Sequence, residues 1–146
     1  MIITFAPLAA GPAWGTPVTL CSGAAEEGPS DWKIDGRSTV EVVAVLAGDS
    51  PKIYDRGNRS HNVAFKVTHQ NADVKAGQAK TLNLSADLPN YGLLKFIPDS
   101  PGEPDGTAYY AIAGLLSFHI EEIGLATIHD FIFICGLFTT TEPDPG

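Results

Sequence analysis

The sequence predicts a mainly β protein, an antiparallel β-sandwich or partly closed barrel with one flanking α-helix over about residues 73–87. Several short segments alternate apolar and polar residues, and loops rich in glycine and proline separate them. There is no βαβ alternation and no internal repeat. At 146 residues the chain is long enough to bury a substantial core, so we expect a single domain over residues 1–146.

The N-terminal segment is apolar but is interrupted by prolines. Ile2–Phe5 fits an edge strand, and Pro7 and Pro12 follow it. Because no basic residue precedes the apolar stretch, we do not interpret it as a signal peptide. We expect residues 1–15 to form an N-terminal arm of this domain.

The middle of the chain predicts strands separated by turns. Residues 38–47 are apolar at both parities, which is typical of a covered strand. Residues 61–70 alternate cleanly, which indicates a half-buried strand with Val63, Phe65 and Val67 on its inner face. Turn residues predict chain reversals at Asp35-Gly36, at residues 48–51 and at Gly57.

A helix is predicted where the alternation stops, over residues 72–88. Asn71 or Asp73 can cap its start, and Pro89 follows its end. Small and apolar residues recur there at helical intervals, at Val74, Ala76, Ala79, Leu82 and Ala86. We expect this to be the only substantial helix.

The last third of the chain predicts two long strands that turn near Gly124. The first has a bend or bulge at Gly114, with Leu116, Phe118 and Ile120 facing inward. The second, over residues 126–140, is the most apolar segment of the chain. Large side chains occupy both of its faces, which indicates burial on both sides or a subunit interface.

A polar C-terminal tail closes the chain. Residues 141–146 carry threonine, proline and acidic residues and no large apolar side chain. We expect them to be flexible, as chain termini commonly are.

Charge is divided unevenly along the chain, whose net charge is −8. All nine basic residues lie between Lys33 and Lys95, whereas residues 96–146 hold eight acidic residues and no base. A duplex-DNA binder needs a basic face, so we expect no sequence-specific nucleic-acid partner. No run of eighteen apolar residues occurs, so we expect no membrane partner either. An acidic surface that favours solubility and a surface for head-to-tail contacts both fit this division.

The sequence lacks the motifs of an enzyme or a metal protein. No nucleophile elbow, phosphate-binding loop or zinc-type spacing occurs. Cys21 and Cys135 lie in apolar strand patterns and predict two buried thiols in a reducing compartment. Glu121 and Glu122 are neighbours on a strand and point to opposite faces, so they cannot act as an acid–base pair. We expect no catalysis, no metal and no cofactor.

The four histidines are the chain's candidate metal ligands. We expect His61 and His69 on the outer, polar face of their strand, about 26 Å apart by strand rise. His119 and His129 fall in consecutive strands and could meet each other or Glu121 across a hairpin. Solvated or interface histidines fit this distribution better than a metal site.

A polar cluster precedes the strand at residues 61–70. It consists of Asp55, Arg56, Gly57, Asn58 and Arg59. Two arginines beside an asparagine could bind a phosphate or a carboxylate. A glycine turn that enters the strand explains the same residues without a ligand. A third interpretation is a salt-bridge point that meets the acidic C-terminal half of a neighbouring copy.

Three segments together resemble small structural proteins of phages and prophages. They are the run DRGNRSHNVAFKV, the helix with Ala79 and Leu82, and the segment LPNYGLLKF. The order strand, helix, strand is also similar to the tail-tube and distal-tail fold of tailed phages. The resemblance covers roughly residues 54–97 and, more loosely, the final strands. It implies a β-sandwich with one flanking helix that assembles into rings.

The function expected from these features is that of a structural subunit of a phage tail or tail-like particle, located in the virion and assembled in the bacterial host cytoplasm. It would form a ring or tube with its own copies and contact other virion proteins. The interface residues expected for this role are Asp55, Arg56, Asn58, Arg59, Phe131, Phe133 and Phe138. The alternative is a carbohydrate- or ligand-binding β-sandwich module without catalysis, for which the aromatic candidates are Trp14, Trp32, Tyr54, Tyr91, Tyr109 and Tyr110.

Overall fold

The computed structural model describes residues 1–11, 13–24, 27–43, 52–98 and 106–145, with the backbone alone for residues 39, 41–43 and 52–58. Its elements in chain order are β1 (Ile2–Ala9), β2 (Ala13–Trp14), β3 (Val18–Ser22), β4 (Ser30–Val43), β5 (Lys52–Gln70), α1 (Val74–Asp87), β6 (Tyr91–Ile97), β7 (Tyr109–Ile123) and β8 (Ala126–Cys135). The predicted mainly β class with one helix is confirmed for this part of the chain.

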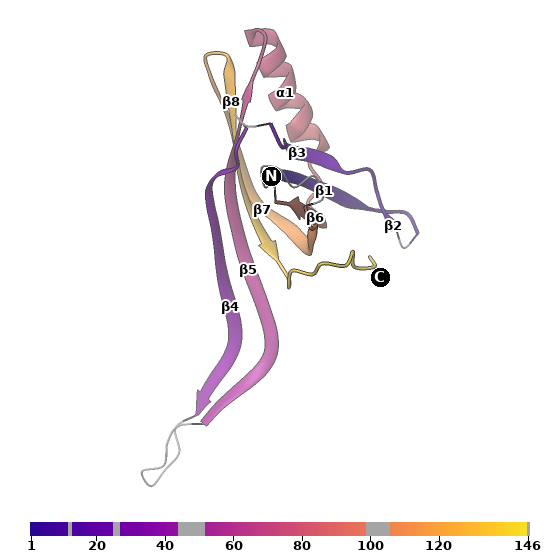
Figure 1. Cartoon of the computed structure of the whole chain (residues 1–146), viewed down its shortest axis with the longest axis vertical. Coiled ribbons are helices and arrows are strands. Elements are labelled where there is room, and N and C mark those ends of the chain that lie inside the picture. Colours follow the sequence, from indigo (N-terminus) through magenta and orange to yellow (C-terminus); the bar gives the residue numbers. More distant parts are fainter. Residues whose placement is uncertain (12, 25–26, 44–51, 99–105, 146) are drawn as a thin grey trace.

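All the strands belong to one antiparallel sheet (Figure 1). Its order is β2-β1-β6-β7-β8-β5-β4, and β3 pairs with β1 beside this path. The sheet is open, so it is neither a sandwich of two separate sheets nor a closed barrel.

The sheet curls around its apolar face, which explains how a single sheet encloses a core. The rings of Phe5 on β1 and Phe133 on β8 lie 5.0 Å apart between centroids, although β6 and β7 separate their strands. Trp32 on β4 likewise meets Phe96 on β6 at 5.3 Å. Burying each of the three phenylalanine side chains contributes about 1.5–3 kcal/mol, whereas Trp32 remains 37% exposed.

The N-terminal strand is part of this core. β1 pairs with β6 on one side and with β3 on the other, and Ile3 and Phe5 are fully buried. The expected edge strand within an arm over residues 1–15 is therefore wrong for residues 2–9. The C-terminal tail also has a contact, because Trp14 Nε1 donates a 2.8 Å hydrogen bond to the carbonyl oxygen of Pro143.

Helix α1 begins and ends close to its predicted bounds. Asp73 caps it, accepting a 2.7 Å hydrogen bond from the backbone N–H of Ala76. The side that faces the sheet is not the apolar one in the sequence pattern, because Val74 is 48% exposed and Leu82 is 71% exposed. Instead Gly77 is buried, and two leucines near the helix end pack on the core, Leu84 and Leu88.

Strands β4 and β5 form one long hairpin that extends away from the other strands (Figure 1). The turns predicted at Asp35-Gly36 and at Gly57 are wrong, because both sites lie inside strands. Gly36 pairs with His61 across the hairpin. Pairing with a distant segment has overridden the local turn preference of these residues.

Strands β7 and β8 form the predicted hairpin around Gly124. The bulge lies between Leu115 and Ser117, close to its predicted position. Leu116 is the residue without a partner there and is 61% exposed, so its predicted inward placement is wrong. Phe118 shares the face of Phe131 by register, yet it remains 40% exposed.

Candidate functional site

The outer half of the β4–β5 hairpin comprises residues 37–43 and 52–60. It is here called the arm and is distinct from the N-terminal arm predicted over residues 1–15. Strand β8 pairs with β5 only from His61 to Gln70, so residues 52–60 have β4 as their one strand partner among the described residues. Figure 1 shows the two strands of the arm running side by side beyond the rest of the sheet. Both edges of the arm therefore offer backbone N–H and C=O groups that could pair with another chain.

The predicted arginine cluster lies on this arm. The side chains of Asp55, Arg56 and Asn58 are outside the described residues, while Arg59 is exposed. Ser38 pairs with Arg59 and Val40 with Asp55, so three residues of β5 lie opposite one residue of β4. The cluster is thus a bulge within a strand, and its interface role remains a prediction.

The phenylalanines predicted to form an interface pack against other residues of the same chain. Phe131 and Phe133 are 1% and 0% exposed in the core, and Phe138 packs against His61 at 5.2 Å between ring centroids. The residues of β8 that alternate with them, Ile132 and Ile134, are 38% and 46% exposed. These isoleucines, and not the buried phenylalanines, provide the apolar surface that β8 exposes.

The placement expected for two histidines is wrong. His61 and His69 share the parity of Val63 and Val67 and therefore face inward, not toward solvent. His69 contacts His129, with ring centroids 4.8 Å apart. His119 pairs with Asp130, is exposed and lies 3.9 Å from Glu121, so His119 and His129 do not meet across the hairpin. The alternation of apolar and polar residues along β5 is the sequence signal that predicts the inward placement of both histidines.

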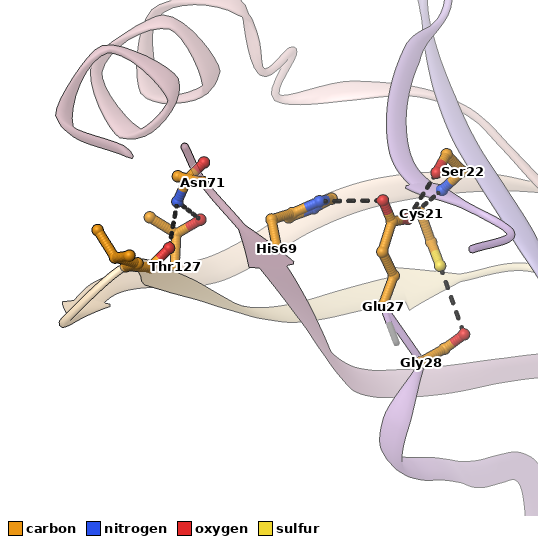
Figure 2. Close-up of polar contacts among 8 residues, drawn as sticks. Cys21, Ser22, Glu27, Gly28, His69, Asn71 and Thr127 are labelled. Atoms are coloured by element: carbon orange, nitrogen blue, oxygen red, sulfur yellow. Dashed lines mark hydrogen bonds and ion pairs between the residues drawn. The ribbon is translucent and has the colours of Figure 1, made fainter. Parts of the chain in front are cut away.

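Glu27 ties the connection between β3 and β4 to its surroundings (Figure 2). One carboxylate oxygen accepts hydrogen bonds from the backbone N–H and the hydroxyl of Ser22, both 2.7 Å, and the other lies 3.3 Å from His69 Nδ1. The backbone carbonyl of Glu27 also accepts from the N–H of Thr68 at 3.0 Å. Burial opposes ionisation, but the hydrogen bonds from Ser22 and the nearby His69 outweigh it, so the pKa of Glu27 is lowered.

His129 is the most unusual polar group of this region. Its side chain is 2% exposed, and neither ring nitrogen has a hydrogen-bond partner among the described residues. Burial, and then the charges of His69 and Lys80, lower the pKa of His129 to about 4. Burial also lowers the pKa of His69, which Glu27 partly offsets. At neutral pH both rings are therefore mainly uncharged.

The cysteines are buried free thiols, as predicted. Cys21 Sγ lies 3.6 Å from the carbonyl oxygen of Gly28, and burial raises the pKa of its thiol. Burial raises the pKa of Cys135 to about 12. Since the thiolate is the nucleophilic form, neither group is activated for catalysis.

The described residues provide neither a metal-binding cluster nor a membrane-spanning helix. They contain no group of three or more histidine, cysteine or acidic residues that could hold a metal ion. Within the same residues, no helix is long and apolar enough to cross a membrane.

Comparison with known proteins adds a fold relationship. No protein-family model and no curated protein sequence matches this chain. Among solved structures it is similar to a chain in the structure described as "Tail of empty GTA particle computed with helical refinement, C6 symmetry". The TM-score is 0.54 at 13% sequence identity, and the match covers 97% of this chain and 96% of that chain. At this identity the likeness shows a shared fold.

Proposed function

We propose that this chain is a structural subunit of a phage tail or tail-like particle that self-assembles into rings or a tube. The observation that carries the proposal is the fold match over nearly the whole of both chains to a tail chain with C6 symmetry. That chain belongs to a gene transfer agent, which is a phage-like particle. The resemblance found in the sequence leads to the same kind of assembly.

The arm supplies the means of association in this proposal. A two-stranded ribbon on its own is marginally stable in water, and its open edges can accept a further strand. Pairing the arm with a sheet edge of a neighbouring copy would satisfy its free backbone groups. Such a contact joins two different surfaces, and repeating it around an axis closes a ring or builds a tube.

The distribution of charge also supports contact between the arm and a neighbouring copy. The chain from residue 96 onward holds eight acidic residues and no base, whereas Arg37 and Arg59 are exposed on the arm. An arm that reaches the acidic part of the next copy would place opposite charges together. Charge complementarity of this kind mainly fixes the register and the choice of partner.

The location and the other partners follow from this role. We place the protein in the virion, assembled in the bacterial host cytoplasm, in contact with its own copies and with other virion proteins. The proposal assigns no catalysis, cofactor or sequence-specific nucleic-acid binding to the chain.

The carbohydrate-binding alternative has less support from the arrangement of aromatic rings. Trp14 is hydrogen-bonded to the tail, and Trp32 packs against Phe65 and Phe96. Lys95 lies over the ring of Tyr110, at 5.6 Å from its centroid. Trp32 and Tyr109 do share one open pocket, but the rest of its lining is apolar (Met1, Ile34, Phe96, Pro98 and Phe138) and offers few hydrogen bonds to a sugar.

Removing the arm tests the proposed function. Replacing residues 38–59 with Asn-Gly joins Arg37 to Ser60, which are already paired, through a two-residue turn suited to a hairpin. We expect the wild-type chain to form oligomers by size-exclusion chromatography with light scattering, and the shortened chain to remain a monomer. Its circular dichroism should keep the β signature, because the core strands are intact.

Two results would contradict the proposal. One is a wild-type chain that stays monomeric at high concentration. The other is a shortened chain that assembles as well as the wild type, which would show that the arm is not the associating element.

A further inference from the structure

Helix α1 is anchored to the sheet along one narrow stripe. Gly77, Lys80, Leu84 and Leu88 recur at helical spacing on the side that faces the sheet. At Gly77 an added Cβ would lie 3.1 Å from Asn71 Nδ2 and 3.7 Å from Thr127 Cγ2, so a larger residue there would require the Asn71 side chain to shift. The apolar residues on the outer side, by contrast, are largely exposed, Val74 at 48% and Leu82 at 71%. The helix is thus a lightly attached cover.

The histidine pair lies on the sheet face that the helix approaches, because Gly77 comes close to Thr127, which pairs with His69 and shares the buried face of β8 with His129. His129 on β8 is 98% buried and contacts His69 on β5, and neither of its nitrogens is hydrogen-bonded among the described residues. Lys80 on α1 acts electrostatically on both rings. A proton on His129 would therefore be opposed by the charge of Lys80 and, once His69 is protonated, by that of His69 as well.

The acidic groups around the pair are arranged unevenly. Glu27, in the connection between β3 and β4, contacts Nδ1 of His69 and not His129. On β7, Glu122 pairs with Thr127, two residues before His129. A first proton would consequently settle on His69 beside Glu27, and a second would have to enter the site of His129 without a direct carboxylate partner.

The dependence on pH follows from the protons bound in each state. In the covered state the pKa of His129 is lowered from 6.5 to about 4, so this state binds fewer protons than a state in which His129 meets water. Its full stability is present above about pH 6.5, the ordinary histidine value, and is lost as the pH falls toward 4.

We propose that the His69–His129 pair and Lys80 make α1 a cover that mild acid releases from the sheet, while Glu27 keeps the connection between β3 and β4 in place. Release relieves the repulsion by moving Lys80 away and admitting water to His129. It also uncovers Leu84 and Leu88, which gives the acid form a new apolar surface. The cover belongs to a single chain and does not depend on assembly.

Hydrogen exchange followed by mass spectrometry tests the cover. After correction for intrinsic exchange rates, we expect peptides within residues 74–87 to lose protection about tenfold or more between pH 7 and pH 4.5. Peptides from β1 and β6 should keep their protection over the same range. Unchanged protection in α1, or equal loss throughout the sheet, would overturn the proposal.

Three variants identify the groups responsible. His129→Phe removes the more deeply buried proton acceptor and should make the protection of α1 much less dependent on pH in this range, leaving only the contribution of His69. Lys80→Met removes the opposing charge and should move the release to lower pH. His119→Gln, at an exposed histidine on the neighbouring strand, should behave as the wild type. If His129→Phe does not fold, Lys80→Met decides, and an unchanged pH of release in that variant would reject the mechanism.

Discussion

Strand β5 belongs to two regions that differ in almost every physical respect. From His61 to Gln70 it lies between β4 and β8, and its inward residues Val63, Phe65 and Val67 are buried. From Lys52 to Ser60 it pairs with β4 alone in the part of the chain that the structure describes. The first region gains its stability within the chain, whereas the second leaves its hydrogen-bonding edges available. We infer that folding depends on the body of the sheet and association on the arm.

The largest loss of stability should follow from adding a side chain at Gly92, in the body of the sheet. Gly92 pairs with Pro7, and an added Cβ would overlap the carbonyl oxygen of Ala6. Gly92→Ala must therefore push β1 away from β6. We expect the free energy of unfolding to fall by more than about 4 kcal/mol, measured by urea denaturation.

Gly114→Ala is the matched control for that substitution. Gly114 also lies in a central strand, but its added Cβ would meet Ile134 Cγ2 at 3.5 Å, an ordinary contact. Its stability should stay within about 1 kcal/mol of the wild type. Equal losses in the two variants would show that the backbone contact at Gly92 is not the cause.

A smaller loss should follow from emptying the core at Phe133. This ring is 0% exposed and packs edge-on against Phe5. Phe133→Ala leaves a cavity and should lower the free energy of unfolding by about 3–4 kcal/mol in the same measurement. The neighbouring Ile134→Ala, at a side chain that is 46% exposed, should lose clearly less. A reversed order would mean that the outer face of β8 carries more of the stability than the core.

Local signals in the sequence predicted the elements that local chemistry determines. The cap at Asp73 and the proline at residue 89 delimited the helix, and the alternation at residues 61–70 identified the inner face of β5. The same alternation, applied to His61 and His69, also predicts that they face inward. Their burial beside Phe138 and His129 was therefore accessible from the sequence.

Long-range pairing determined the features that the sequence did not predict. Asp35-Gly36 and Gly57 have strong turn preferences. Asp35 and Gly36 nevertheless pair with Asn62 and His61, and Gly57 lies in a bulge within β5, in a hairpin whose length depends on both of its strands. The central position of β1 depends on β6, more than eighty residues away in the sequence. The inward side of α1 depends on where Gly77 can approach Thr127, which no helical periodicity reveals.

The smallest effect on stability, and the sharpest contrast with the body, is expected at Arg59 on the arm. Its side chain is exposed, so Arg59→Glu should change the free energy of unfolding by no more than about 0.5 kcal/mol. If the arm meets the acidic part of a neighbouring copy, the same change should weaken assembly and make it less sensitive to salt, as measured by light scattering. Lys75→Glu, an equal charge change at an exposed site on α1, is the control and should leave assembly unaltered. Assembly that weakens equally in both variants would reflect net charge, and assembly that weakens in neither would remove Arg59 from the interface.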